Sequence, residues 1–213
     1  MSEKIKNWIV QNIQLLINIY LFINILGIIA WQTHGLYQRG HLNLIEITFI
    51  LNNGALAWVV LVRQKHVSIN HNPWQQLIAL IAFFSGIAFI GEPSSEQPLL
   101  SLISQALLLI ASLLGLLSIF HLKDSFGILI AYRSIKTQGL YRYVRHPMYA
   151  TDILLRIGYL VSHFNPITML LFALSTGCYA YRAMLEEDFL SSQTDTYMTY
   201  KKQVPYRFIP GLI

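Results

Sequence analysis

Six apolar runs, each close to the length needed to cross a bilayer, constrain what this 213-residue chain can fold into. A transmembrane helix needs about 20 apolar residues to cross roughly 30 Å of hydrocarbon. The runs lie at 8–31, 44–62, 74–91, 99–120, 148–163 and 166–185. Composition agrees, because 54% of the residues are hydrophobic, 12% are charged and the mean hydropathy is +0.49. The sequence therefore predicts an all-α, polytopic membrane helix bundle and excludes a disordered chain, a disulfide scaffold and an ordinary soluble enzyme.

The number of transmembrane helices is expected to be five to six. The run at 148–163 is short and carries Asp152 and Arg156, so it could instead form a re-entrant hairpin with the sixth run. The first run follows Lys4 and Lys6 as in a signal peptide, but it is too long and lacks a small-x-small cleavage site before Trp31. We therefore interpret it as a retained first helix.

The distribution of basic residues predicts that both termini are cytoplasmic, since lysine and arginine gather on the cytoplasmic side of membrane proteins. With this orientation Arg39 lies outside and Arg156 lies within a span. The other basic residues all fall inside: Lys4, Lys6, Arg63, Lys65, Lys123, Arg133, Lys136, Arg142, Arg145, Arg182, Lys201, Lys202 and Arg207. The net charge of +5 thus reflects topology, and no nucleic-acid partner is expected.

The chain is predicted to be one continuous domain with two halves of different character. Residues 1–120 form four spans, and the polar side chains of the first span share one face, which we interpret as interhelical hydrogen bonding. Residues 121–213 hold most of the basic, acidic and aromatic residues, so chemistry is expected there. No Rossmann glycine motif and no phosphate-binding loop is present, and the scattered histidines predict no metal site.

Residues 136–149 form a basic, aromatic segment that leads into the fifth run. Pro147 suits the first turn of a helix, where its missing N–H costs nothing. Tyr141, Tyr143, His146 and Tyr149 could clasp a flat heterocycle. They could equally form an aromatic belt at the membrane surface, and composition does not choose between the two interpretations.

A second candidate group lies at the cytoplasmic end of the sixth run. Arg182 and Glu186 are four residues apart and share a helix face, as in an ordinary ion pair. The adjacent carboxylates of Glu186 and Glu187 could also hold an ammonium or sulfonium group. The amphipathic tail that follows, with Tyr197 and Tyr200, could fold back as a lid.

Taken in order, these motifs resemble integral-membrane methyltransferases, the group that includes isoprenylcysteine carboxyl methyltransferases and phospholipid methyltransferases. The resemblance covers about residues 121–211 and rests on the ordered set rather than on any one element. The matching elements are Asp124-Ser-Phe-Gly127, Lys136-Thr-x-Gly-x-Tyr141, Arg145-His-Pro-x-Tyr149, Glu186-Glu187 and the Tyr197, Tyr200 and Ile209-Pro210 tail.

The resemblance implies S-adenosylmethionine bound at the cytoplasmic face, and an acceptor that is lipophilic. Arg182 would face the acceptor as the catalytic residue, and the stretch that ends at Lys136 would contribute mostly backbone contacts. The other implied cofactor residues are Tyr141, His146, Pro147, Met148 and Tyr149 around the adenosine, with Glu186 and Glu187 at the methionine part. Thr151 stands where the family often has glycine, which is expected to alter the acceptor path.

Two other functions were weighed. Sterol and steroid reductases that use NADPH carry a similar Arg-His-Pro-Asn-Tyr-x-Gly-Asp/Glu stretch, and Asp152 matches its acidic position. However, Met148 and Thr151 depart from it, and the Glu186-Glu187 pair beside Arg182 favours the methyltransferase. A non-enzymatic membrane scaffold is the third alternative. The sequence does not define the acceptor, which could be an isoprenylated cysteine, a lipid headgroup, a small thiol or a quinone-like lipid.

Overall fold

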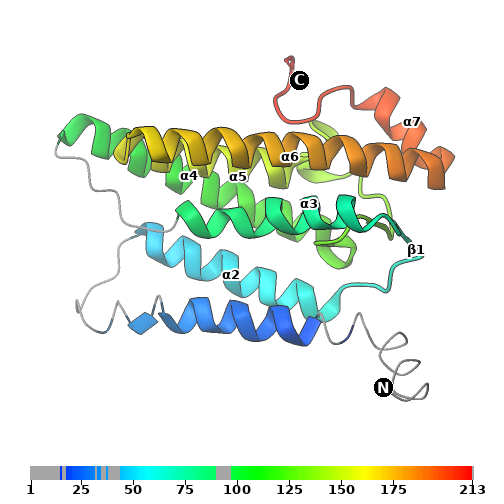
Figure 1. The fold of residues 1–213 in the computed structure, drawn as a ribbon, viewed down its shortest axis with the longest axis horizontal. Coiled ribbons are helices and arrows are strands. Elements are labelled where there is room, and N and C mark those ends of the chain that lie inside the picture. Colours follow the sequence, from blue (N-terminus) through cyan, green and yellow to red (C-terminus); the bar gives the residue numbers. More distant parts are fainter. Residues whose placement is uncertain are drawn as a thin grey trace.

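The protein is a bundle of helices that lie side by side along one long axis (Figure 1). The computed structural model describes residues 18–31, 44–89 and 97–212, together with residues 15, 33, 34 and 37. The bundle consists of the helix Asn18–Trp31, α2 (Leu44–Val62), α3 (Pro73–Phe84), α4 (Pro98–Leu122), α5 (Pro147–Ser162) and α6 (Pro166–Gln193). The predicted helical architecture is confirmed.

The helix bounds differ from the predicted spans in two places. α3 ends at Phe84, where the prediction continued to residue 91, because the chain turns into the 3₁₀ helix η1 (Ser85–Phe89). α6 runs to Gln193, eight residues beyond the predicted end at residue 185. Among the described helices, α2 and α4 are long and apolar enough to cross a membrane. The count of five to six spans and the cytoplasmic termini remain predictions, and residues 8–14 and 90–96 lie outside the described part of the chain.

Local sequence signals set where two of the helices begin. The Asn72 side chain accepts hydrogen bonds from the N–H groups of Trp74 (3.0 Å) and Gln75 (3.3 Å) and caps α3. Asn165 and Thr168 form a capping box at the start of α6. Proline follows the cap residue in both helices, at a position where no N–H is needed.

Small and polar residues bring α4 close to its neighbours α2 and α5. The Ser104 hydroxyl donates to the carbonyl oxygen of Gly158 in α5 (2.7 Å), and a Cβ atom on Gly158 would lie only 3.1 Å from Leu108. The Asn52 amide of α2 donates to the Ser112 carbonyl oxygen of α4 (2.8 Å). Close approach at small residues and interhelical hydrogen bonds are typical of membrane bundles.

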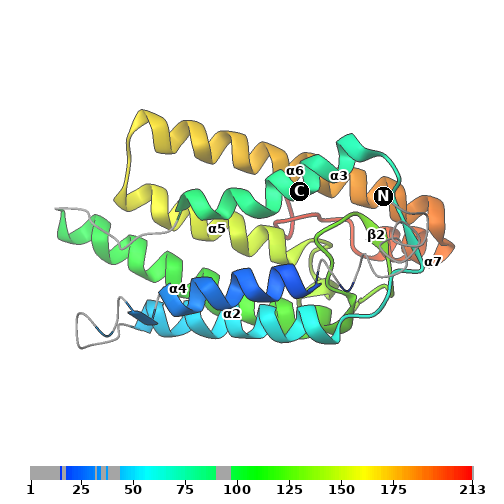
Figure 2. The ribbon, with the colours of Figure 1, turned by 60° about the horizontal axis from the view of Figure 1, so that its bottom comes forward.

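Loops and short elements gather at one end of the bundle, which we call the polar end (Figure 2). It comprises residues 63–72, residues 123–146, α7 (Asp195–Gln203) and the tail 204–212. The two-residue strands β1 (Ser68–Ile69) and β2 (Ala131–Tyr132) pair antiparallel and join the first two of these segments. The short 3₁₀ helices η2 (Lys123–Ser125) and η3 (Gly139–Arg142) lie within the second.

The C-terminal tail folds back over the start of α5, as the amphipathic pattern suggested. The backbone N–H groups of Arg145 and His146 donate to the carbonyl oxygens of Tyr206 and Arg207, each at 2.9 Å. Tyr197, Tyr200 and Val204 form a small buried cluster against Ile135. The tail therefore closes the polar end instead of extending from it.

Candidate active site

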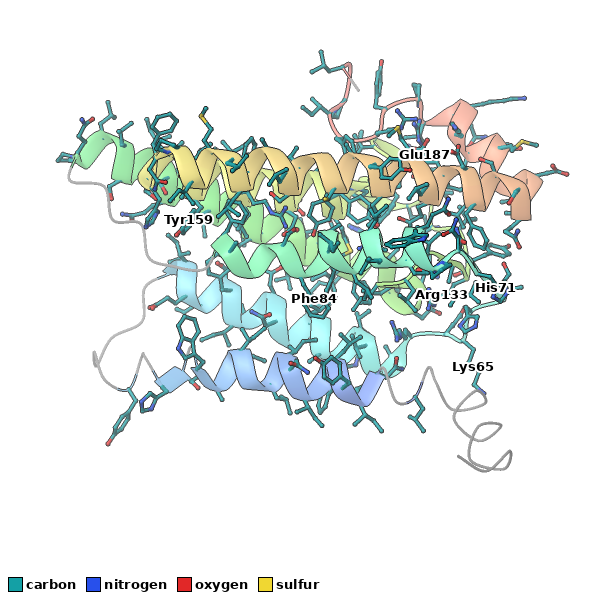
Figure 3. The ribbon with its side chains drawn as sticks, viewed as in Figure 1. Lys65, His71, Phe84, Arg133, Tyr159 and Glu187 are labelled. Atoms are coloured by element: carbon teal, nitrogen blue, oxygen red, sulfur yellow. The ribbon has the colours of Figure 1, made fainter. Side chains whose placement is uncertain are left out.

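A large cavity of about 860 Å³ extends from the polar end into the bundle. Arg133 lines the cavity at the polar end, and Phe84 lines it farther along the bundle. Tyr159 lies nearer the opposite end of the bundle (Figure 3). Deeper in, the cavity is lined mainly by apolar residues from the helix Asn18–Trp31, α2, α3 and α4. One space thus joins a polar site to an apolar channel.

Most of the predicted cofactor residues meet in the polar part of this cavity. Those that line it are Lys136, Tyr141, His146, Met148, Tyr149 and Glu186, and the predicted catalytic Arg182 lines it too. Two predicted residues do not line the cavity. Pro147 is buried at the first position of α5, and Glu187 is a buried residue of α6. Polar and aromatic lining residues that were not among the predicted site residues include Arg133, Asp152, Tyr197 and Tyr200.

Tyr141 is placed by a turn that requires glycine. Gly139 has a φ of +61°, and a Cβ atom there would lie 2.1 Å from the His121 ring at the end of α4. This turn starts η3 and buries Tyr141, whose carbonyl oxygen accepts a hydrogen bond from the Tyr200 hydroxyl (2.7 Å). Burial, with smaller effects of Tyr200 and Glu186, raises the pKa of the Tyr141 phenol well above its usual value, so the phenol stays protonated.

Tyr149 lies among rings and charged groups in the first turn of α5. Its ring stacks on that of His146, with centroids 5.1 Å apart and planes 7° from parallel. The Arg182 guanidinium lies 5.2 Å from the centre of the same ring. The Tyr149 hydroxyl donates a hydrogen bond of 2.5 Å to Glu186, which fixes that carboxylate at the cavity wall.

Glu186 and Glu187 occupy different environments although they are adjacent. The Glu186 carboxylate faces the cavity and the Tyr149 hydroxyl. Glu187 is 0% exposed and pairs with Arg145 (2.8 Å), His146 (3.2 Å), Arg207 (3.2 Å) and, at 3.4 Å, Lys201, whose side chain is partly exposed. Burial alone would raise the pKa of the Glu187 carboxyl, but the hydrogen bonds from these partners hold it far below its usual value.

Arg182 makes contacts that its spacing from Glu186 did not reveal. Its side chain is 2% exposed and donates to three backbone carbonyl oxygens, those of Ala79 (3.0 Å), Gly127 (3.1 Å) and Ile128 (2.7 Å). It therefore ties α6 to α3 and to the Asp124-Ser-Phe-Gly127 motif, while its Nε atom has no hydrogen-bond partner within the described residues.

Lys136 and Arg133 supply positive charge to the polar part. The Lys136 ammonium pairs with Asp124 at 2.8 Å, which links two of the sequence motifs across the cavity wall. Burial lowers the pKa of the Arg133 guanidinium, and the nearby Glu186 carboxylate opposes this shift. In the described part of the chain, no group of three or more His, Cys, Asp or Glu side chains is arranged to hold a metal ion.

Comparison with known proteins bears on this site. Residues 103–192 match the family model described as the isoprenylcysteine carboxyl methyltransferase (ICMT) family. This segment is similar to that family. The matched ICMT segment includes Tyr141, His146, Tyr149, Arg182 and Glu186, so the resemblance drawn from the motifs is confirmed.

The fold is also similar to a solved structure. That structure is of the eukaryotic intramembrane Ras methyltransferase ICMT in the absence of a monobody. Its sequence is 21% identical to this chain, and the two folds superpose with a TM-score of 0.50. The comparison covers 100% of this chain and 88% of that chain. No curated protein sequence gives a significant match. Neither the ICMT family match nor the fold favours the reductase alternative.

Proposed function

We propose that the chain transfers a methyl group from S-adenosylmethionine to a lipophilic acceptor of the isoprenylcysteine type, within a membrane. The observation that carries the proposal is that Tyr149, Arg182 and Glu186, all within the ICMT-matched segment, line one cavity that continues between apolar helices. A polar cofactor dissolves in water and a lipid-like acceptor dissolves in the membrane. Their reaction therefore needs a polar site that opens into an apolar one.

The polar part of the cavity fits the cofactor chemically. Glu186 offers a carboxylate to the methionyl ammonium, held in position by the Tyr149 hydroxyl. The protonated Tyr141 and the rings of His146 and Tyr149 offer flat surfaces and hydrogen-bonding groups to an adenosine. Lys136 contributes from the same wall. Glu187 already pairs with Arg145, Lys201 and Arg207 and hydrogen-bonds with His146, so the proposal gives it the role of anchoring the tail rather than contacting the cofactor.

Methyl transfer demands alignment and a dry site more than acid–base chemistry. S-adenosylmethionine supplies an electrophilic methyl on a sulfonium, and an acceptor carboxylate or thiolate attacks it in line. Arg182 would orient the acceptor, since it lines the cavity and its guanidinium lies over the Tyr149 ring. Holding two reactants in line is worth several kcal/mol. The tail and the tyrosines Tyr197 and Tyr200 would keep water out.

The apolar part of the cavity gives the acceptor a path. It runs along α2 and α4, the two helices long and apolar enough to cross a membrane. The proposal therefore has the lipid chain of the acceptor lie between these helices, and the cofactor enter at the polar end from the cytoplasm. Thr151, where the family often has glycine, lines the cavity beside Gly115, so the proposal has it narrow this path.

The test is methyl transfer by the purified protein in detergent. With tritiated S-adenosylmethionine and N-acetyl-S-farnesylcysteine, we expect a base-labile methyl ester, released as labelled methanol. NADPH should neither bind nor be oxidised. Binding of NADPH without binding of S-adenosylmethionine would overturn the proposal in favour of a reductase.

A matched pair of variants tests the cofactor site. Glu186→Gln should weaken binding of S-adenosylmethionine by about 1.5–3 kcal/mol, the range for a hydrogen bond to a charged group. Asp188→Asn removes an exposed carboxylate on the same helix that does not line the cavity, so it should bind as the wild type does. Equal affinities for the two variants would remove Glu186 from the cofactor site.

A further inference from the structure

Asp152 is an acidic residue of the cavity to which methyl transfer assigns no role. It lies at the acidic position of the reductase motif and lines the cavity from α5, about one helical turn beyond Tyr149. Its side chain is 36% exposed, so a ligand in the cavity can reach the carboxylate. An ionisable group inside a membrane protein is costly and usually serves a function.

Two neighbours hold the Asp152 carboxylate in place. The Arg156 guanidinium, which is 0% exposed, pairs with its Oδ2 atom at 3.2 Å, and the Tyr179 hydroxyl donates a hydrogen bond to the carboxylate. The same guanidinium lies 4.5 Å from the centre of the Tyr179 ring. Because Arg156 balances the charge of Asp152, a neutral donor fits the pair better than a cation, which would add an uncompensated charge away from water.

A short series of contacts connects Asp152 to the residue proposed to orient the acceptor. The Arg182 guanidinium lies 5.2 Å from the centre of the Tyr149 ring, and the centre of the Tyr179 ring lies 5.1 Å from that of Tyr149. The Tyr179 hydroxyl in turn reaches Asp152. The three residues from Tyr149 to Asp152 rise about 4.5 Å along the helix, close to the length of one amino-acid unit, about 3.8 Å. A cysteine whose carboxylate lies at Arg182 can therefore present its amide N–H to Asp152.

The chemistry of the acceptor gives this carboxylate a use. An isoprenylcysteine in amide linkage carries an N–H on the same carbon as the carboxylate that takes the methyl group. Fatty acids, the ordinary carboxylic acids of a membrane, have no such N–H. Binding of an acid without this donor would remove water from the Asp152 carboxylate and put no hydrogen bond in its place, which is unfavourable.

We propose that Asp152 accepts a hydrogen bond from the amide N–H of the acceptor cysteine, and that it thereby selects isoprenylcysteine over membrane acids that lack this group. Arg156 and Tyr179 hold the carboxylate at the cavity wall for this contact. The inference rests on the proposed function and specifies how its acceptor is recognised.

The experiment offers two farnesylated acids to the purified protein in one reaction with tritiated S-adenosylmethionine. They are N-acetyl-S-farnesylcysteine and S-farnesyl-3-thiopropionic acid, which has the same chain, thioether and carboxylate but no acetamido group. At equal concentrations, the wild type should methylate the cysteine compound about tenfold faster or more, the effect of a hydrogen bond to a charged group. In the double variant Asp152→Leu/Arg156→Leu, which leaves neither charge unpaired, the ratio of the two esters should fall to about one.

Both esters form in one vessel, so their ratio does not depend on the fraction of folded protein and a partly unstable variant remains informative. Asp188→Asn removes an exposed carboxylate of α6 that does not line the cavity, and it should keep the wild-type ratio. Equal rates for the two acids in the wild type, or an unchanged ratio in the double variant, would overturn the assignment. Asp152 would then be only the counterion of Arg156, while the proposed methyl transfer would stand.

Equilibrium binding separates this inference from the proposed reaction. In the presence of S-adenosylhomocysteine, the wild type should bind the cysteine compound more tightly than the thiopropionic acid, and the double variant should bind the two equally. That result without methylation of either acid would overturn the proposed reaction and leave the amide contact standing. Binding of neither acid would overturn both.

Discussion

At the scale of single residues, the adjacent carboxylates Glu186 and Glu187 show how one helix separates two functions. Successive residues of an α-helix point about 100° apart, so Glu186 faces the cavity while Glu187 faces the returning tail. The ion pairs of Glu187 with Lys201 of α7 and Arg207 of the tail help to hold the tail over the polar end. Sequence spacing could identify the pair, but it could not tell the two roles apart, because the cations come from segments up to 42 residues away.

The first prediction concerns the pH dependence that Glu187 introduces. Because its partners lower its pKa in the folded state, the ionised carboxylate stabilises the fold at pH values above the ordinary carboxyl pKa. This stability is lost progressively as the pH falls below about 4, because the unfolded chain then binds a proton at this carboxyl while the folded protein does not. The Tm measured in detergent should therefore drop between pH 7 and acidic pH.

The variant Glu187→Gln should lower the free energy of unfolding at pH 7 by about 3–5 kcal/mol, because it leaves the buried Arg145 guanidinium without its charge partner. Its Tm should also vary less with pH than that of the wild type. Asp188→Asn is the control, since Asp188 is exposed on the same turn. A pH dependence of Tm that is identical in the wild type and Glu187→Gln would contradict the assignment.

The second prediction concerns Arg182, whose three carbonyl partners could be its whole role. If it orients the acceptor, Arg182→Gln should lower turnover by about a hundredfold or more and change the affinity for S-adenosylmethionine little. Arg182→Lys should restore little activity, because an ammonium cannot reproduce the geometry of a guanidinium that binds several groups.

The Tm of both Arg182 variants separates positioning from structure. Turnover that survives at saturating cofactor, with a lowered Tm, would mean that Arg182 only ties α6 to the Gly127–Ile128 backbone. The ordered motifs predicted that Arg182 belongs to the site. They gave no sign of its carbonyl partners, because backbone groups carry no residue-specific signal.

At the scale of elements, the turn that begins η3 connects the end of α4 to the cofactor residues. Gly139 has a positive φ, and the His121 ring occupies the space of any Cβ atom. The Gly in the Lys136-Thr-x-Gly-x-Tyr motif is thus a conformational requirement, and Tyr141 depends on it for its place in the cavity wall.

The third prediction is that Gly139→Ala weakens binding of S-adenosylmethionine and lowers the Tm. The left-handed conformation alone costs a non-glycine residue about 1–2 kcal/mol, and the overlap with His121 adds to this. The control is Gly177→Ala, in α6, where a Cβ atom meets nothing within 4 Å and should be neutral or slightly stabilising. His121→Ala combined with Gly139→Ala should recover part of the loss, since it removes the overlap but not the strained φ. Wild-type affinity in Gly139→Ala would contradict this account.

Helix ends were predicted well where side-chain signals exist and poorly where they do not. The start of α6 has an asparagine cap followed by proline, and the predicted and observed residues agree at Pro166. The end of α3 has no such signal, because the apolar pattern continues through Ile87 and Phe89 although the helix changes to η1 at Ser85. Apolar length alone therefore overestimated this span.

At the scale of the whole molecule, the arrangement of helices places the proposed site residues and the basic loops at one end. Residues 63–72, residues 123–146 and α7 all lie at the polar end, and the turn between α5 and α6 lies at the other (Figure 1). The apolar runs predicted that successive connecting segments would lie alternately at the two ends of the bundle, and they do. This alternation could be predicted because each helix of the bundle runs opposite to the one before it. The cavity could not be predicted, since it depends on how six bundle helices and α7 pack together.

The fourth prediction is that the polar end faces the cytoplasm and the α5–α6 turn faces the opposite side. Residues predicted to be cytoplasmic include Arg63, Arg133, Arg142 and Lys202, all at the polar end, and a high density of basic residues favours the cytoplasmic side.

The natural Cys178 is first replaced by serine, so that single cysteines can be introduced at Arg142 and at Phe164. Both positions are exposed, so their reactivity reports the side of the membrane rather than burial. In intact cells, a membrane-impermeant maleimide should label Phe164→Cys and not Arg142→Cys, and permeabilised cells should show both labelled. Because α5 is the helix that joins the two positions, labelling of both from outside would mean that α5 does not cross the membrane. Labelling of Arg142→Cys alone would place the cofactor site on the side that S-adenosylmethionine does not reach, and would overturn both the topology and the entry path of the cofactor.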